Sequence, residues 1–348
     1  MKILITGAAG FLGYHLTNYF FNKGYEVIGL DIAEFPQGDY PEEMKKYNID
    51  VRDREKLEAL IKNESPDIII HAAAALPLWS KKDIFTTNVD GTRNVLDLAK
   101  KYNIERVIFI SSTAVYGVPK IHPILEEHPL IGIGPYGESK ILAEKACEEY
   151  RQKGLCVPVI RPKTFIGPAR LGVFEILFDW VHDNKKIPAI GNGKNHYQLL
   201  EVDDLCDAIY LTLSKEKEIV NDTFNVGAMK FTTVKEDLEN FFKKIDSKSR
   251  VIATPAGLVK FFLAIFNILK VSPLYKWVYD TADRDSFVST EKIQRDLGWR
   301  AKYSNQDAFI RAYQWYLEHY EEVKKGGEGV THRKAWKQGI LSLIKKFM

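Results

Sequence analysis

A tyrosine and a lysine four positions apart, Tyr136 and Lys140, form the pair in this sequence best placed to move a proton. On a helix the two side chains share one face, and the ammonium group favours the phenolate, which lowers the pKa of the tyrosine. Ser112 ends an apolar run earlier in the chain, and its hydroxyl can hold a substrate oxygen. We therefore expect Ser112, Tyr136 and Lys140 to form a catalytic triad that carries a proton while a hydride moves to or from a nicotinamide.

The Tyr-x-x-x-Lys spacing alone carries little information, because the sequence contains it four times. The other pairs are Tyr19/Lys23, Tyr116/Lys120 and Tyr320/Lys324. Pro119 interrupts the second of these, and neither the first nor the third follows a serine at the end of an apolar run. Only Tyr136 stands where this chemistry is expected.

The first residues have the pattern of a dinucleotide-binding turn. An apolar run over 2–6 leads directly into Gly7-Ala-Ala-Gly10-Phe11-Leu12-Gly13, and a helical pattern and a second apolar run follow. The first glycine permits the tight turn, the second lets backbone N–H groups approach a pyrophosphate, and the third lets the helix lie close to the sheet. The helix N-terminus attracts the phosphates. The cofactor-binding residues expected here are Gly7, Gly10, Phe11, Leu12 and Gly13.

Asp31, at the end of the second apolar run, distinguishes between the two nicotinamide dinucleotides. A carboxylate at this position accepts hydrogen bonds from the hydroxyls of the adenosine ribose and repels a 2′-phosphate. No arginine or lysine follows in Ile32-Ala33-Glu34 to neutralise such a phosphate. We expect the cofactor to be NAD rather than NADP.

Two residues after the third expected strand are further candidates for cofactor binding. The carboxylate of Asp50 can accept a hydrogen bond from the adenine amino group while Val51 packs on the ring. Asp50 can equally cap the helix that follows. The sequence leaves both roles of Asp50 open.

Three alanines with small side chains follow the fourth expected strand. Ala72, Ala73 and Ala74 follow His71, and their small side chains let the chain run against a flat cofactor. Asn88 lies in a helical pattern, within Asn-Val-Asp-Gly-Thr, where asparagine and glycine cost stability. This indicates a functional kink, and we expect Asn88 to belong to the cofactor site.

Apolar runs and helical patterns alternate from residue 1 to about 165 at the spacing of βα units. The alternation predicts an α/β fold of Rossmann type, a doubly wound parallel sheet with ligands at the carboxyl ends of its strands. We expect a NAD-binding core over 1–165, continued by parts of 195–230. A smaller, mainly substrate-binding domain over 166–323 and a glycine hinge with a basic tail helix over 324–348 should follow.

The composition is that of a globular protein, with 348 residues of which 45% are hydrophobic and 27% charged. The net charge of +3 is local, because residues 330–348 hold five of the 49 basic residues and no acid, which leaves 44 basic against 46 acidic residues elsewhere. We therefore expect no binding of nucleic acid.

Three widely spaced cysteines favour reduced thiols over disulfides or a metal site. The chain starts with an apolar run, so we expect no signal peptide and a cytoplasmic location.

Together these motifs resemble the extended short-chain dehydrogenase/reductase superfamily, and within it the NAD-dependent epimerase/dehydratase family, over about residues 1–323. The shared residues are the Gly7/Gly10/Gly13 turn, Asp31, Asp50-Val51, His71 to Ala74, Asn88-Val-Asp-Gly-Thr, Ser111-Ser112, Val115-Tyr-Gly, Tyr136/Lys140, Arg161-Pro162, Gly167-Pro168 and Val202-Asp203-Asp204. The resemblance implies that Ser112 binds a substrate oxygen, that Tyr136 is the acid/base, and that Lys140 binds ribose and tunes Tyr136. It also implies a homodimer that pairs through helices 83–101 and 135–153.

Three departures from the family pattern concern the substrate. Thr113-Ala114 stands where dehydratases have an Asp-Glu pair, so a sugar 4,6-dehydratase is disfavoured. Thr164 stands where nucleotide-sugar members usually have asparagine, and Tyr197-Gln198 where they tend to have an Arg-Asp pair whose arginine binds the diphosphate. Lys163, Arg170 or Arg284 could replace that cation. The candidate substrate contacts are Thr113, Thr164, Tyr197 and Arg284.

The segment 256–271 is apolar nearly all round a helix, yet it is too short and too interrupted by polar residues to span a bilayer. It is either a buried helix of the substrate domain or a lid against an apolar substrate. Together with Ser272-Pro-Leu and the segment 289–299, it is similar to the 3β-hydroxysteroid-dehydrogenase-like branch, whose substrates are sterol-like or lipid alcohols.

A last packed helix is expected over 305–323, followed by the hinge Gly326-Gly-Glu-Gly329. Beyond the hinge, one helical face carries apolar residues and the other carries lysines. The apolar residues are Trp336, Ile340, Leu343, Ile344 and Phe347, and the lysines are Lys337, Lys345 and Lys346. We hypothesise that 330–348 binds anionic lipid peripherally at the inner membrane surface. The alternative is a helix docked on the protein body or on a second subunit.

Three functions are consistent with these features. The first is an epimerase that oxidises a carbon of a sugar, most simply a nucleotide sugar, and returns the hydride to the other face. The second is a dehydrogenase or reductase of a sterol, isoprenoid or other lipid alcohol, favoured by the segment 256–271, the tail and the missing arginine. The third is a catalytically idle NAD-binding sensor, which the complete triad disfavours. We expect the first.

Overall fold

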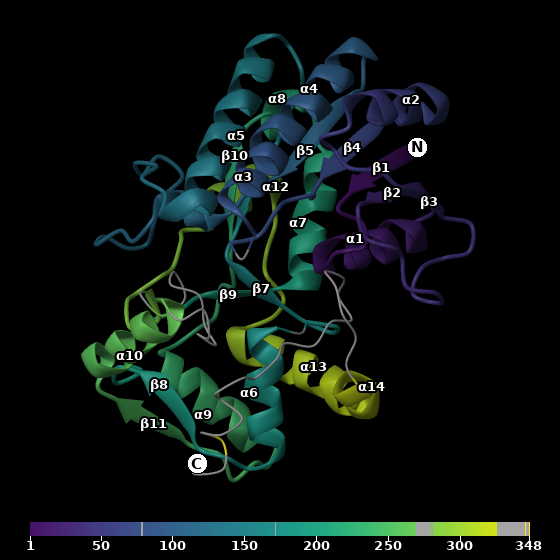
Figure 1. Ribbon diagram of the computed structural model, residues 1–348. Helices are drawn as coiled ribbons and strands as arrows, with labels where there is room; N and C mark the ends of the chain where they lie inside the picture. The colour runs from purple at the N-terminus through teal and green to yellow at the C-terminus, as the bar shows by residue number, and fades with distance from the viewer. Residues whose placement is uncertain (78, 171, 269–278, 280, 326–344, 346–347) are drawn as a thin grey trace.

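The computed structural model describes residues 1–348 except 78, 171, 269–278, 280, 326–344 and 346–347 (Figure 1). Its centre is a seven-stranded parallel sheet in the order β10-β6-β5-β4-β1-β2-β3. The strands are β1 (Lys2–Thr6), β2 (Glu26–Asp31), β3 (Lys45–Asn48), β4 (Ile68–His71), β5 (Arg106–Ile110), β6 (Val159–Pro162) and β10 (Thr223–Val226). The strand order reverses between β1 and β4, which confirms the predicted doubly wound α/β fold.

Alternate residues of each central strand point to opposite faces of the sheet. Ile3 and Ile5 of β1 belong to one core, and Leu4 belongs to the other. The first core packs against α1 (Phe11–Asn22) and α7 (Val202–Ser214), and the second against α2 (Arg54–Glu64), α4 (Thr92–Lys101) and α5 (Gly134–Gln152). Because helices cover both faces, the central strands are mostly apolar, and the polar side chains that could do chemistry lie near the strand ends.

The C-terminal half forms a further apolar core away from the main sheet (Figure 1). This core contains α6 (Val173–His182), α9 (Val234–Lys244), α13 (Asn305–Glu318) and a two-stranded sheet of β8 (Ile187–Ile190) and β11 (Val251–Thr254). A second small sheet, β7 (Thr164–Ile166) and β9 (Leu199–Glu201), lies between this core and the main sheet. The short elements are α3 (Lys81–Phe85), α8 (Lys217–Val220) and α12 (Glu291–Leu297).

Two of the helices expected in the C-terminal half differ in detail from the structure. The helix α10 (Ala256–Ile268) begins as expected, but Leu258 and Phe261 are 54% and 60% exposed, whereas Leu263 is buried. The prediction of one helix over 305–323 is wrong, because α13 ends at Glu318 and α14 (Tyr320–Lys325) begins after His319. Within the described residues, no helix combines the length and apolar character needed to cross a membrane.

Most of the tail lies outside the described residues, so its binding to lipid stays a hypothesis. Lys345 and Met348, near the end of the chain, are described, and both contact the protein. Lys345 Nζ forms ion pairs with Asp179 (2.5 Å) and Asp183 (2.7 Å), on α6 and directly after it. Met348 packs against the C-terminal core.

Candidate active site

The turn between β1 and α1 requires glycine at two points. Gly7 has a φ of +73°, and a Cβ on it would lie 2.7 Å from the backbone nitrogen of Ala73. A Cβ on Gly13 would lie 2.1 Å from the carbonyl oxygen of Gly7, because α1 packs directly on the turn. The helix begins after Gly10, which has no side chain to cap the first N–H groups. These N–H groups and the positive end of the helix dipole fit the phosphates of a dinucleotide.

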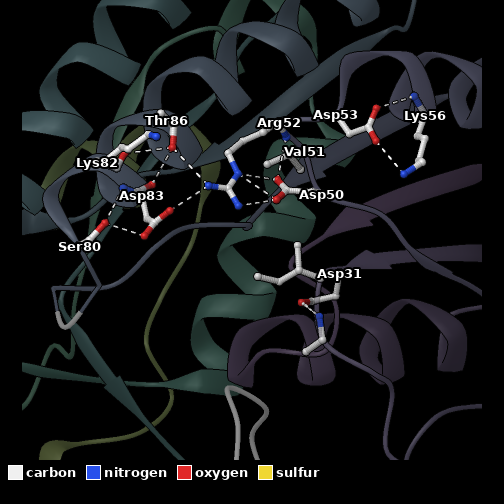
Figure 2. Close-up of polar contacts among 12 residues, drawn as sticks. Asp31, Asp50, Val51, Arg52, Asp53, Lys56, Ser80, Lys82, Asp83 and Thr86 are labelled. Atoms are coloured by element: carbon white, nitrogen blue, oxygen red, sulfur yellow. Dashed lines mark hydrogen bonds and ion pairs between the residues drawn. The ribbon is translucent and has the colours of Figure 1, made fainter.

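Asp31 ends β2 beside this turn (Figure 2). Its Oδ2 accepts a hydrogen bond from the Ala9 N–H, and its Oδ1 accepts one from the Ala33 N–H, both at 2.9 Å. Burial raises the pKa of Asp31, while these N–H groups act to lower it. Each carboxylate oxygen has a further lone pair. The residue is therefore fixed in place and chemically suited to a ribose diol, as expected for an NAD site.

Asp50 follows β3 and is held by Arg52 (Figure 2). Its Oδ2 lies 2.6 Å from Nη2 of Arg52, and its Oδ1 accepts from the Arg52 backbone N–H at 2.9 Å. Burial acts to raise the pKa of Asp50, but the hydrogen bonds from Arg52 outweigh it and the pKa is lowered. The helix α2 is capped by Asp53, whose Oδ1 accepts from the Lys56 N–H at 3.1 Å, so the capping role considered for Asp50 is wrong. Its contact with adenine stays a prediction.

Arg52 also ties the segment after β3 to α3 (Figure 2). Its Nη1 lies 3.1 Å from Asp83 Oδ1 and 3.4 Å from Thr86 Oγ1. Val51 is buried, and a Cβ on Gly91 would lie 2.7 Å from its Cγ2, so these two residues pack together. Sequence reasoning missed Arg52, because Asp83 lies far along the chain and no local pattern relates the two residues.

His71 positions the alanine run at the end of β4. Its Nδ1 lies 2.7 Å from Thr6 Oγ1, and its Nε2 lies 3.0 Å from Thr92 Oγ1. Burial, reinforced by the charge of Lys140, lowers the pKa of His71 to about 3, so the ring is neutral at pH 7. The same Thr6 Oγ1 accepts from the Ala73 N–H at 3.2 Å. The half-buried residues at this strand end are Ala72, Ala73 and Ala74.

The predicted kink at Asn88 is confirmed, because Thr86–Gly91 forms a π-helical turn between α3 and α4. Asn88 Oδ1 accepts from the Ala75 N–H (2.8 Å), and its Nδ2 donates to the Ala75 carbonyl (3.1 Å) and to Ser139 Oγ (2.9 Å). Ser139 donates to the carbonyl of Tyr136 at 2.8 Å. Asn88 thus links the alanine run to the helix that carries Tyr136, and its direct contact with the cofactor stays a prediction.

Ser112, Tyr136 and Lys140 lie at the carboxyl end of β5. Ser112 follows the strand closely, and its Oγ accepts from the Ala114 N–H at 3.1 Å. Lys140 is 3% exposed, and its Nζ donates to the carbonyl of Ile110, the last residue of β5, at 2.8 Å. The same Nζ lies 6.0 Å from the centre of the Tyr136 ring. The geometry therefore places a buried cation beside a phenol at the strand end where ligands bind.

The carboxylate of Glu144 favours the charged form of Lys140. Burial lowers the pKa of Lys140 to about 8, and Glu144, one turn further along α5, acts to raise it. Glu144 is itself buried, where its Oε2 lies 2.6 Å from Nη2 of Arg161, and it also accepts the hydroxyl of Ser111. Sequence reasoning missed Glu144, although its spacing from Lys140 places both on one helix face.

Two of the candidate substrate residues contact each other, since Thr164 Oγ1 and the Tyr197 hydroxyl are 3.0 Å apart. Of the cations that could replace the missing arginine, Lys163 has its Nζ 5.0 Å from the centre of the Tyr197 ring. Arg170 stacks over Phe11 at 4.9 Å. The remaining candidates are Thr113, half-buried in the turn after Ser112, and Arg284, which is exposed.

Comparison with known proteins shows what this arrangement is similar to. A model of the NAD dependent epimerase/dehydratase family matches residues 3–227. An uncharacterized protein of Sinorhizobium fredii is 32% identical over 98% of this chain and 85% of its own. The UDP-glucose 4-epimerase of Halalkalibacterium halodurans is 27% identical over 92% of this chain and 96% of its own. The crystal structure of the Thermotoga maritima UDP-glucose 4-epimerase with UDP-glucose has a TM-score of 0.77 at 24% identity, over 92% of this chain and 100% of that one, which shows a common fold.

The close contact at Gly13 predicts that adding one methyl group there, in Gly13→Ala, will lower both stability and NAD affinity. Gly13→Ala should displace α1 from the turn, lower the free energy of unfolding by about 1–3 kcal/mol, and weaken NAD binding. Gly257→Ala is the matched control, because a Cβ there meets nothing within 4 Å. Calorimetric NAD titration and urea unfolding of both variants test this. Equal NAD affinity of Gly13→Ala and the wild type would contradict the proposed cofactor site.

The buried ammonium of Lys140 predicts a pH dependence of stability. Its pKa is about 8 in the folded protein and 10.5 ordinarily, so the unfolded chain binds more protons between these values, and stability rises with pH there. Relative to Lys140→Met, the wild type should therefore gain on the order of 3 kcal/mol between pH 7 and pH 10.5. Urea unfolding of both proteins across this range measures the difference. A constant difference would show that Lys140 is not desolvated.

Proposed function

The chain belongs to the NAD-dependent epimerase/dehydratase family, and from that premise we propose that it is a nucleotide-sugar epimerase. It is an enzyme, and its cofactor is NAD. In the proposed reaction a secondary alcohol carbon of the sugar is oxidised to a ketone, and the hydride then returns to the opposite face of the same carbon. Substrate and product are stereoisomers, and no cofactor is consumed.

The observation that carries the proposal is the position of Ser112, Tyr136 and Lys140 at the end of β5. The neighbouring strands β4 and β1 end at the alanine run and at the glycine turn, so the cofactor elements and the triad share one edge of the sheet. UDP-glucose 4-epimerases that match more than nine-tenths of this chain support a sugar substrate. Thr113-Ala114, in place of an acid pair, leaves no group there to expel a hydroxyl, which favours an epimerase over a dehydratase.

The proposed roles follow from the chemistry of each side chain. Tyr136 takes the proton of the substrate hydroxyl during oxidation and returns it during reduction. Ser112 holds the substrate oxygen through both steps. Lys140 favours the phenolate of Tyr136 by its charge, and its ammonium has donors left for a ribose hydroxyl. Bound NAD supplies the acceptor for the hydride.

A second candidate function is favoured by a different observation. Leu258 and Phe261 project from α10 with more than half of their surface exposed, and Tyr197 replaces the arginine typical of nucleotide-sugar members. Both features suit an apolar alcohol substrate. In that case the same triad would catalyse net oxidation or reduction, with NAD entering and leaving as a cosubstrate.

The proposal predicts interconversion of a nucleotide hexose and its epimer without added NAD. A substrate deuterated at the reacting carbon should keep its label, because the same hydride returns. Tyr136→Phe should lower kcat about 10²- to 10⁴-fold. Tyr320→Phe, which alters the same Tyr-x-x-x-Lys spacing elsewhere, should leave kcat unchanged. Chromatography of UDP- and dTDP-hexoses and mass spectrometry measure these outcomes.

The same assay separates the two candidates. NADH accumulation with an apolar alcohol, without conversion of any nucleotide sugar, would contradict the epimerase proposal and support the second function. Full activity of Tyr136→Phe would contradict the role of Tyr136 in either reaction.

A further inference from the structure

We propose that Lys163, assisted by Ser286 and Tyr197, forms a subsite for an anionic oxygen group of the substrate, either its diphosphate or a carboxylate on its sugar. This rests on the proposed function, because it specifies how a nucleotide sugar is held by a chain that lacks the usual arginine.

Lys163 lies at the edge of the sheet where ligands bind. It stands between the last residue of β6 and the first of β7, and its backbone N–H donates to the carbonyl of Val226, at the end of β10, at 2.8 Å. The carboxyl end of β5, with Ser112 and the Lys140 contact, belongs to the strand next to β6. Lys163 therefore lies at the carboxyl ends of β6 and β10, next to the strand end that carries Ser112.

The ammonium group of Lys163 is buried. The residue is 3% exposed, and its Nζ donates to Ser286 Oγ at 2.6 Å. Among the residues that the structure describes, no ion pair involves Lys163, whereas Arg161, similarly buried two residues earlier on β6, is paired with Glu144. Buried charges in proteins are normally paired. An ammonium has three donors, so two remain for a ligand.

The surroundings of Lys163 suit the oxygens of an anion. Tyr197 takes the position of the family's arginine, and the Lys163 Nζ lies 5.0 Å from the centre of its ring. The Tyr197 hydroxyl lies 3.0 Å from Oγ1 of Thr164, the residue that follows Lys163. Lys163 thus places a cation beside Tyr197, the residue at the position of the family's arginine. An ammonium is a point charge and lacks the two parallel N–H donors of a guanidinium.

The electrostatics of the site make its affinity sensitive to pH. Burial lowers the pKa of Lys163 to about 7. Among the described residues, the charged or titratable groups near this site include His122, whose pKa Lys163 acts to lower and Asp285 acts to raise, Asp285 itself, which adjoins Ser286, and the Tyr197 phenol. Because an anion binds the protonated lysine, affinity should fall as pH rises through 7, and a bound anion should raise the pKa of Lys163.

The test compares Lys163→Met and Lys163→Arg with the wild type, all loaded with NAD, and uses Lys230→Met as an exposed-lysine control. Calorimetry measures the binding of UDP, UDP-glucose, UDP-glucuronate and inorganic pyrophosphate from pH 6 to 9. Lys163→Met should weaken binding about tenfold to hundredfold, the size of a charge-assisted hydrogen bond. Lys163→Arg should restore affinity and abolish the pH dependence of UDP-glucose binding, since arginine stays protonated and the diphosphate diester of UDP-glucose does not titrate between pH 6 and 9.

Each result decides the proposal. Equal weakening of UDP, UDP-glucose and pyrophosphate assigns Lys163 to the diphosphate, and weakening of UDP-glucuronate alone assigns it to a sugar carboxylate. Unchanged affinity for all four probes in folded Lys163→Met overturns the subsite. If the wild type binds pyrophosphate through Lys163 but no nucleotide, the anion subsite stands and the nucleotide-sugar proposal fails.

Discussion

A buried ion pair, Glu144 with Arg161, is the interaction on which the geometry of the site depends. The guanidinium also donates to the Tyr116 hydroxyl at 2.7 Å and to the Glu126 carbonyl at 2.9 Å, and Glu144 accepts the Ser111 hydroxyl. One pair of charges therefore joins α5 to the ends of β5 and β6 and to the turn after Ser112. Removing one partner of a buried pair leaves an uncompensated charge, at a cost of about 3–5 kcal/mol. The orientation of α5, and with it of Tyr136 and Lys140, is fixed by this constraint.

Three buried cations described at this edge of the sheet differ in how far polar or negatively charged neighbours balance their charge. Arg161 is fully paired, and Lys140 has Glu144 one helical turn away together with a backbone carbonyl. Lys163 has a hydroxyl and the face of an aromatic ring. The series runs from a charge paired within the protein, through one that lies beside the Tyr136 phenol, to one for which we propose a ligand anion. We propose that desolvation without full pairing is the physical feature that separates functional from structural cations at this edge.

Much of this arrangement could be predicted from the sequence because its causes are local. The glycine turn and Asp31 are set by backbone sterics and by the end of a strand, and the alternation of apolar runs predicts the sheet. The kink at Asn88 could be predicted because asparagine is unusual within a helical pattern. The ion pair of Arg52 with Asp83 and the Lys163 contact with Ser286 could not be predicted, since each joins residues far apart in the sequence that only the tertiary fold brings together.

The measurement that tests the central claim most directly is the cofactor content of the purified protein. The protein is prepared without added nucleotide, dialysed and denatured, and the released NAD and NADH are quantified by chromatography. An enzyme that removes a hydride and returns it to the same carbon should retain close to one equivalent of cofactor through dialysis. A protein that emerges empty and takes up NAD reversibly would contradict this account, because it would consume the cofactor in net oxidation or reduction.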